Sequence, residues 1–204
     1  LAATEPTDAG NTLFLDPKTG QWDLELLRAM GLDERLLPPV RGTAEVVGYL
    51  TERVASELGL PSGVPVVAGA GDMACSAIGT GAVEEGVVAV TIGTAAQVLT
   101  CVPAIDPAGV GSVTFHPHAA AGTIFALGSI FSGGLSLRWL ASALGEEDRL
   151  SREGGAYFED LSAAAGAVEP GSGGALFLPF LVGSGSPFWN PTARAGWVGL
   201  TVSS

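Results

Sequence analysis

Short apolar runs alternate with glycine-rich turns between Val64 and Leu99, and this stretch organises the chain. Apolar runs of this length are typical of buried strands, and a run of small residues suits a closely packed helix. The expected elements are a strand over 64–68, a helix over 73–82, and strands over 87–92 and 97–102. The first turn carries a single acid, Asp72, and a later turn carries Gly93-Thr94. Together the turns predict a site at which a base faces a phosphate group.

The flanking segments carry helix and strand signals of their own. Asp23 and Thr51 can cap helices that Gly31 and Gly59 end. Two segments, 113–118 and 122–128, are expected to pair as strands. The other expected elements are a short strand over 46–49, a helix beginning near Leu135, a helix over 157–165 that follows a polar segment over 146–155, and a buried strand from Leu176. These segments predict an α/β protein.

Composition and charge limit the partners. Of the 204 residues, 47% are hydrophobic and 15% are charged, which is typical of a folded protein rather than a disordered one. The formal net charge of −12 argues against nucleic acid or an anionic membrane as the main partner. A nucleotide ligand is still compatible with this negative charge, because the backbone N–H groups of glycine loops, local cations and Mg²⁺ can bind its phosphates.

The chain shows no signal peptide at its start, which lacks a basic segment followed by an apolar one. The uncharged stretch 119–137 is long enough to span a membrane, but glycines and hydroxyl residues interrupt it, so we interpret it as a strand, a loop and the start of a helix. Cys75 and Cys101 form no disulfide framework and are expected as buried free thiols in a reducing compartment. We therefore expect a soluble, cytoplasmic protein.

Two kinds of chemistry fit the central stretch. Residues 69–74 match G-x-G-x-x-A, the fingerprint of a dinucleotide-binding oxidoreductase. Asp72, however, would face the pyrophosphate, and Glu84 and Glu85 precede the next strand instead of ending it. Phosphoryl transfer fits better, because a carboxylate at a strand end can accept the proton of an attacking hydroxyl. Gly93-Thr94 would offer backbone N–H groups to the phosphates, and a Cβ at Gly93 would hold them away.

Four motifs follow one another in a characteristic order: PVVAGAGD, VTIGTAAQV, GGLSLRWL and LPFLVGSGSPFWNPTARAGWVGLT. In this order they resemble the FGGY carbohydrate kinases, and the upstream DPKTGQWDLELL is similar to the xylulokinase-like branch. The resemblance covers nearly the whole chain but only the middle of the family's length. The N-terminal D-x-G-T strand and the late glycine-rich adenosine segment are not in this sequence. We therefore expect the chain to be part of a longer protein and to be inactive alone.

The resemblance implies an actin-like ATPase (ribonuclease H-like) fold, with two α/β domains around an interdomain cleft, both incomplete in this chain. Residues 1–84 would be the C-terminal part of the first, sugar-binding domain. Residues 85–204 would be the N-terminal part of the second, nucleotide-binding domain. The implied partners are a sugar and ATP with Mg²⁺, with a homodimer as one admissible assembly. A catalytically silent binding module of the same fold is the alternative, followed by the dinucleotide-binding oxidoreductase.

The family's site residues map onto single positions of this sequence. The resemblance implies that Asp72 is the catalytic base and also binds the sugar. Met73 would be the second sugar-binding residue, although Gln or Asn is common there in the family. The residues implied to bind the nucleotide are Gly93, Thr94, Gly134 and Arg138, and no protein ligand to a metal is implied. Residues 184–187, Ser-Gly-Ser-Pro, replace the more usual Gly-Glu-Arg-x-Pro. The substrate stays open among xylulose, another ketose, a polyol and glycerol.

Several of these positions also have plainer explanations. Arg138 can pair with Glu146 or Glu147 near the end of its helix. His116 and His118 alternate on an expected strand and lack a third metal ligand, so a surface or loop role is expected for them. The tryptophans at 189 and 197 are expected as core or cleft-edge aromatics.

Overall fold

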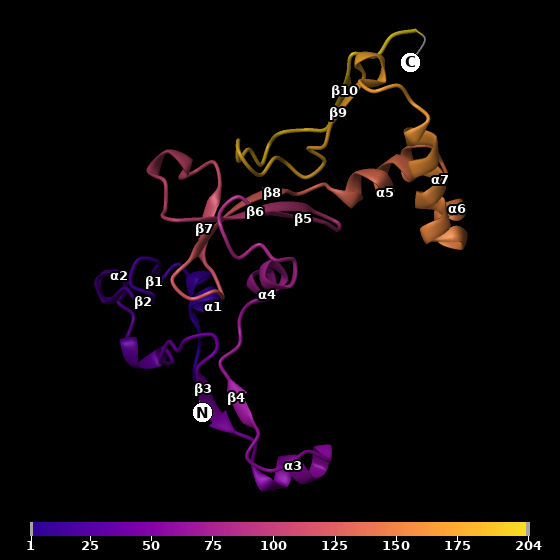
Figure 1. Cartoon of the computed structure of the whole chain (residues 1–204). Coiled ribbons are helices and arrows are strands. Elements are labelled where there is room, and N and C mark those ends of the chain that lie inside the picture. The colour runs from indigo at the N-terminus through magenta and orange to yellow at the C-terminus, as the bar shows by residue number, and fades with distance from the viewer. Residues whose placement is uncertain (1, 203–204) are drawn as a thin grey trace. The chain divides into compact units, whose positions relative to one another are not determined.

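The computed structural model describes residues 2–202 and divides into two compact units, each assembled from several stretches of the chain. Unit 1 comprises the chain up to Ala89 together with Leu99–Val110 and Thr114–Leu127. Unit 2 comprises Val90–Val98, Gly111–Val113 and the chain from Gly128 onward. The units are described separately below, and Figure 1 labels their elements.

The elements follow one another in an α/β order. The helices are α1 (Pro6–Gly10), α2 (Leu24–Ala29), α3 (Glu52–Leu58), α4 (Asp72–Gly79), α5 (Gly134–Ala143), α6 (Glu147–Glu153) and α7 (Gly155–Gly166). Short 3₁₀ turns are η1 (Glu34–Leu36), η2 (Pro107–Gly109) and η3 (Ser172–Gly174). The strands are β1 (Leu15–Asp16), β2 (Gln21–Trp22), β3 (Val46–Tyr49), β4 (Pro65–Val67), β5 (Val88–Ile92), β6 (Ala96–Val102), β7 (Thr114–Pro117), β8 (Ile124–Ile130), β9 (Leu176–Leu178) and β10 (Gly196–Val198).

Local capping explains where two helices of unit 1, α2 and α3, begin. The Asp23 side chain accepts hydrogen bonds from the backbone of Glu25 and Leu26 at the start of α2. Thr51 caps α3 through the N–H of Val54, and Gly59 ends it in the left-handed conformation. The predictions for these helices, and for the strand over 46–49, are confirmed.

The strands pair mainly between neighbours in the chain. β1 pairs with β2, β3 pairs antiparallel with β4, and β9 pairs antiparallel with β10. A four-stranded sheet has the order β5-β6-β8-β7. In it β7 and β8, both labelled in Figure 1, are antiparallel. His116 lies opposite Phe125 in this pair. The expected pairing of 113–118 with 122–128 is therefore confirmed.

The core of unit 1 forms where α4 packs against the sheet. It is a cluster of buried residues: Ala74, Ala77, Ala82, Leu99, Ala119, Phe125 and Leu127. The helix contributes only alanines to this buried cluster, and their small side chains let its backbone come close to the larger groups of the strands. The prediction of a closely packed helix after Asp72 is confirmed.

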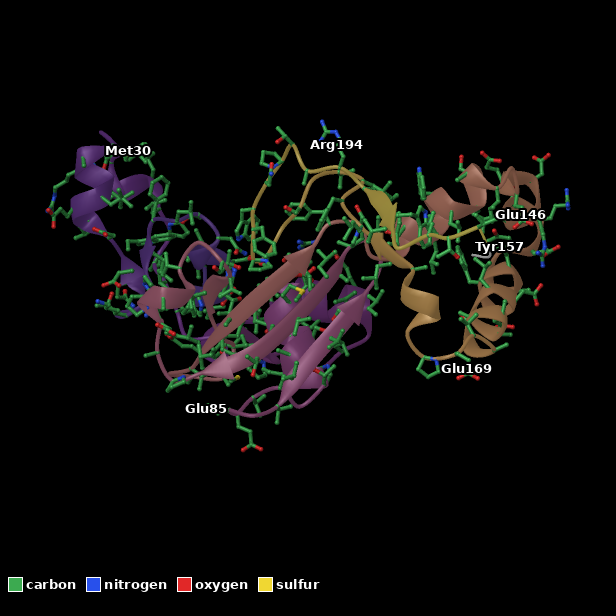
Figure 2. The ribbon with its side chains drawn as sticks, turned by 90° about the horizontal axis from the view of Figure 1, so that it is seen from above. Met30, Glu85, Glu146, Tyr157, Glu169 and Arg194 are labelled. Carbon is green, nitrogen blue, oxygen red and sulfur yellow. The ribbon has the colours of Figure 1, made fainter. Side chains whose placement is uncertain are left out.

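Unit 2 contains the helical segment α5 to α7. The Tyr157 ring on α7 is fully buried, and its hydroxyl donates to Glu146 Oε2 at 2.8 Å (Figure 2). Arg149 forms ion pairs with Glu153 and with Asp160. Most of the polar segment 146–155, for which no secondary structure was predicted, forms α6. Acidic residues in its first turn and the Arg149–Glu153 pair favour the helix.

Aromatic rings connect α5 to the last strands of unit 2. The Phe177 ring lies between Trp139 and Trp197, with centroid distances of 5.4 Å and 4.9 Å. The Trp189 indole N–H donates to Ser112 O at 3.2 Å, and its ring contacts Phe131. The tryptophans at 189 and 197 are each 40% or more exposed, so they lie at the unit's surface rather than in its core.

The two cysteines have different surroundings. Cys101 is buried, its thiol donates to Ala82 O at 3.2 Å, and burial raises its pKa. Cys75 is a free thiol as well, but it is exposed on α4. The prediction of two buried thiols is wrong for Cys75, because α4 turns its alanines rather than this residue to the core. Over residues 2–202, no helix is both long enough and apolar enough to cross a membrane.

Candidate active site

Asp72 is the first residue of α4, directly after the glycine-rich turn that follows β4. Gly71 occupies the N-cap position, and its carbonyl accepts the N–H of Cys75 at 3.0 Å. The Asp72 Oδ1 atom accepts the N–H of Met73 at 2.7 Å, and the residue is exposed. The helix fixes the backbone of Asp72, and its carboxylate is accessible to a ligand from solvent.

A hollow of about 110 Å³ lies beside Asp72 within unit 1. Its lining from outside α4 includes Thr7, Asp8 and Asn11 at α1, and His116 and Phe125 of the β7–β8 hairpin. Met73 also lines it, while packing against the core cluster. Sequence reasoning identified Asp72 and Met73 but missed the other polar residues of the hollow. No local pattern marks the α1 residues, because about sixty residues separate them from Asp72 in the chain.

The two histidines are held by the hairpin. His116 shares a hydrogen bond of 2.8 Å with Thr114 Oγ1, its ring stacks on Phe125 at 5.2 Å, and burial lowers its pKa. His118 is only 4% exposed, its Nδ1 accepts the N–H of Ala120, and its Nε2 donates to Ala82 O at 3.1 Å. Burial lowers the pKa of His118 too, which favours the neutral ring. His118 lies in the loop between β7 and β8, as the expected surface or loop role allows, but it is buried there. It packs beside Phe125 and bonds Ala82, three residues after the end of α4.

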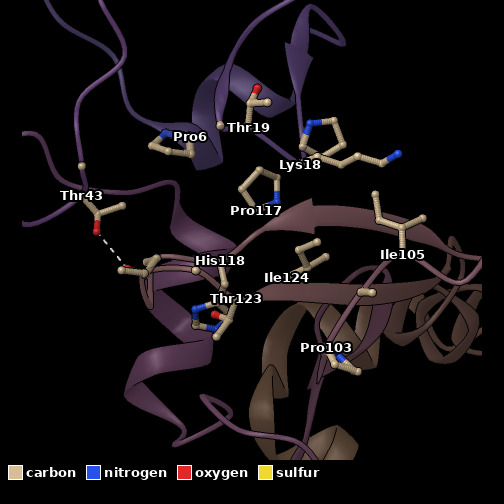
Figure 3. A pocket seen from close by; sticks show the side chains of 17 residues that line it. Pro6, Lys18, Thr19, Thr43, Pro103, Ile105, Pro117, His118, Thr123 and Ile124 are labelled. Atoms are coloured by element: carbon tan, nitrogen blue, oxygen red, sulfur yellow. Dashed lines mark hydrogen bonds between the residues drawn. The ribbon is translucent and has the colours of Figure 1, made fainter.

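A larger hollow of about 550 Å³ lies elsewhere in unit 1 (Figure 3). The turn containing Lys18, the loop around Ile105 and the 117–124 segment line it, and most of its surface is apolar. The Thr43 hydroxyl at its edge is already bonded, since Thr43 Oγ1 donates to Ala119 O at 2.9 Å. Lys18 lies beside Asp16, and the hydrogen bond from the Lys18 backbone N–H is the main cause that lowers the pKa of that carboxyl, with a smaller contribution from the Lys18 charge. None of the predicted site residues lies in this hollow.

In unit 2 the Gly93-Thr94 turn contacts the start of α5. The N–H of Gly134 donates to Gly93 O at 2.7 Å, and the N–H of Leu135 donates to Thr94 O at 3.1 Å. A Cβ on Gly134 would lie 2.6 Å from Gly93 O, closer than real Cβ atoms come to any atom. The structure thus brings together Gly93, Thr94 and Gly134, three residues predicted to bind the nucleotide. Close packing against Gly93 by itself explains why a glycine stands at position 134. Gly93 and Thr94 are exposed.

Arg138 lies on the exposed surface of α5. The expected pairing with Glu146 or Glu147 is wrong, because these carboxyl groups accept hydrogen bonds from Tyr157 and Ser142 instead. Within the described part of the chain, Arg138 forms no ion pair. Its guanidinium is therefore open to a ligand of negative charge.

The dinucleotide-binding alternative fails on strand topology. In that fold the helix after the glycine turn connects two parallel strands of one sheet. Here β4, which precedes the turn, pairs antiparallel with β3, whereas β5, which follows α4, belongs to the four-stranded sheet. The glycine pattern over 69–74 is therefore a turn with a different use.

Family comparison agrees with the motif order. The N-terminal domain of the FGGY family of carbohydrate kinases matches residues 2–79, and its C-terminal domain matches residues 88–204. The chain belongs to this family. Its fold is therefore the actin-like ATPase fold expected from the resemblance.

Individual relatives are similar over almost the whole chain. A xylulose kinase from Lactococcus lactis subsp. lactis is 31% identical over 98% of the chain and 38% of the relative. A glycerol kinase from Shewanella pealeana is 34% identical over 97% and 38%. The crystal structure of a xyloylose kinase from Brucella ovis superimposes with a TM-score of 0.84 at 28% identity, covering 99% of this chain and 40% of that one. The chain therefore spans about two fifths of the length of the proteins it resembles.

Proposed function

We propose that the full-length protein carrying this sequence transfers the γ-phosphoryl group of ATP to a hydroxyl of a ketose or polyol. One observation carries the proposal: Asp72, at the position of the family's base, is exposed beside a hollow that Thr7 and Asp8 also line, instead of being packed in the core. Membership of the carbohydrate kinase family supports the same reaction class. The relatives named for xylulose and glycerol support a sugar or polyol as the acceptor.

Asp72 acts as the general base in this proposal. One carboxylate oxygen accepts the proton of the sugar hydroxyl as the hydroxyl oxygen bonds to the γ-phosphorus, and the bond from phosphorus to the β–γ bridging oxygen of ATP breaks. Oδ1 already accepts the N–H of Met73, which fixes the carboxylate plane and leaves Oδ2 for the substrate. Met73 contributes an apolar contact to the sugar, since it lines the hollow with Asp72.

Gly93 and Thr94 hold the phosphates. The atom nearest to a Cβ built on Gly93 is Ala95 O at 3.9 Å, so the chain itself has room for a side chain there. A close phosphate would account for glycine at that point. Ser132, just before α5, is 1% exposed and its hydroxyl has no partner among the described residues, which fits a polar ligand near the helix start. Gly134 supports the turn, and Arg138 offers a positive charge to the nucleotide.

Mg²⁺ enters as part of the nucleotide substrate. The described residues contain no group of three acidic, histidine or cysteine side chains arranged to hold a metal ion. The ion would neutralise charge that develops during transfer. We also propose that residues 1–84 belong to the sugar-binding domain and 85–204 to the nucleotide-binding domain. The two family matches, over 2–79 and 88–204, support this division.

A coupled assay of ADP release, run on the full-length protein with a panel of ketoses and polyols, tests the proposal. We expect one substrate class to stimulate ADP release strongly, with a phosphorylated product identified by mass spectrometry. ATP binding without transfer to any member of the panel would contradict the kinase assignment and favour a silent binding module.

A further inference from the structure

A buried hydrogen-bond relay connects the segment before α1 to the residue that precedes Asp72. The Thr7 hydroxyl accepts the N–H of Gly71 at 2.7 Å and donates to Glu5 Oε1 at 2.6 Å. Glu5 and Thr7 are 3% and 5% exposed. The relay therefore joins two parts of unit 1 that lie 64 residues apart in the chain.

The relay is itself anchored at the Glu5 end. Glu5 Oε2 accepts the N–H of Thr7 at 2.7 Å, and Oε1 also accepts the N–H of Asp8 at 2.8 Å. The preceding residue, Thr4, exchanges backbone hydrogen bonds with Pro39 and Arg41. Three donors thus converge on one buried carboxylate, an arrangement that fixes the side chain and orients the Thr7 hydroxyl toward Gly71.

Gly71 is held on both sides of its backbone. Its N–H donates to Thr7, and its carbonyl accepts the first hydrogen bond of α4 from Cys75. A Cβ at this position would lie 3.3 Å from Thr7 Oγ1 and 3.4 Å from Asp8 Oδ1, so the two segments are already in close contact. Because Asp72 follows directly, the position of its Cα depends on where Thr7 holds Gly71.

We propose that Glu5 and Thr7 are positioning residues that fix the Asp72 carboxylate at the hollow through the Gly71 N–H. This inference rests on the proposed role of Asp72 as the base. A hydroxyl is required at position 7, since it must accept one hydrogen bond and donate another. Neither residue touches the reacting atoms, so their loss acts on the geometry of the base rather than on proton transfer itself.

Three substitutions separate positioning from general packing. Thr7→Val keeps the shape of the side chain but removes the hydroxyl, and Thr7→Ser keeps the hydroxyl. Thr12→Val is the matched control, because the Thr12 hydroxyl donates to Ala9 O at the other end of α1 and is not joined to Gly71. Misplacing a reacting group by about 1 Å can cost a factor of about 100 in rate.

Steady-state kinetics on the full-length protein provide the first test. We expect Thr7→Val to lower kcat/KM for the sugar at least about tenfold while KM for ATP stays within about twofold. Thr7→Ser should recover most of the loss, and Thr12→Val should match wild type. If Thr7→Val retains wild-type kcat/KM, or if Thr7→Ser is as impaired as Thr7→Val, the proposal is overturned while the kinase assignment stands.

Amide hydrogen exchange provides a second test that needs neither activity nor a variant. In the unsubstituted protein, the Gly71 N–H should exchange slowly, because its acceptor is a buried hydroxyl. Fast exchange at Gly71 would overturn the positioning role even if the protein is an active kinase. Slow exchange in a protein with no kinase activity would show that the proposed function fails and the relay does not.

Discussion

Replacing Gly134 with alanine tests the contact between α5 and the Gly93-Thr94 turn. The new Cβ would lie 2.6 Å from Gly93 O, whereas ordinary contact begins at 3.4 Å, so the turn must retreat by about 0.8 Å. That retreat also lengthens the 2.7 Å hydrogen bond from the Gly134 N–H. The substitution therefore disturbs the phosphate-binding turn without changing any polar side chain.

The expected change in the free energy of unfolding of Gly134→Ala is the sum of three contributions. Overpacking costs about 1–3 kcal/mol, and weakening the hydrogen bond costs about 1 kcal/mol. The better helix propensity of alanine returns about 0.5–1 kcal/mol. We expect the free energy of unfolding to fall by about 1–3 kcal/mol, and KM for ATP to rise because the turn has moved. Gly166→Ala is the control, since nothing lies within 4 Å of its Cβ and the same propensity gain applies at the end of α7.

Urea denaturation measures the first quantity, and initial rates at varied ATP concentration measure the second. Gly134→Ala should be less stable than wild type, whereas Gly166→Ala should be unchanged or slightly more stable. A Gly134→Ala protein with wild-type stability and wild-type KM for ATP would refute the close approach between turn and helix.

Three further predictions address the core, the buried histidine and the turn. Leu99→Ala should lower the free energy of unfolding by about 2–5 kcal/mol, because Leu99 is buried in the core. Val90→Ala is the control and should lower it by much less, because Val90 is 60% exposed. Equal losses in urea denaturation would contradict the assigned core. Because burial lowers the pKa of His118, the unfolded chain binds its proton first as pH falls below 6.5. The stability contributed by the neutral His118 ring is therefore lost as pH falls toward the lowered pKa. Between about pH 7 and about pH 5, the Tm of wild type should drop more than the Tm of His118→Gln. Parallel curves of Tm against pH for the two proteins would refute this prediction. Gly93→Ala should raise KM for ATP with little loss of Tm, since its Cβ has room in the chain; an unchanged KM would remove Gly93 from the phosphate site.

Local signals in the sequence predicted most of the elements correctly. Asp23 and Thr51 cap their helices as expected, because capping depends on a side chain and the two or three residues that follow it. The short apolar runs over 64–68, 87–92 and 97–102 contain strands as predicted, because this signal also depends only on residues that are neighbours in the chain. The helix α6 within the polar segment 146–155 was not predicted, because its polar residues stabilise it through charge placement and an ion pair, which a hydrophobic pattern does not reveal.

The sequence predicted only some of the residues of the candidate site. Asp72 was identified because it stands in a strand-ending turn within a recognisable order of motifs. Thr7, Asp8 and His116, which share its hollow, carry no local signature and meet Asp72 only through the tertiary fold. A surface or loop role was expected for His118, and it does lie in the loop after β7, but the sequence did not reveal its burial, since alternation along the chain does not show which face another element covers. His118 packs beside Phe125 and bonds Ala82.

The central claim is that Asp72 is the base, and the turnover of Asp72→Asn tests it most directly. The amide keeps an oxygen for the Met73 N–H, so circular dichroism and Tm should match wild type, with Glu84→Gln controlling for the loss of an exposed charge. We predict that kcat of the full-length protein falls about 10²–10⁴-fold, because the amide cannot take the hydroxyl proton. An Asp72→Asn protein that keeps most of its turnover would contradict the account.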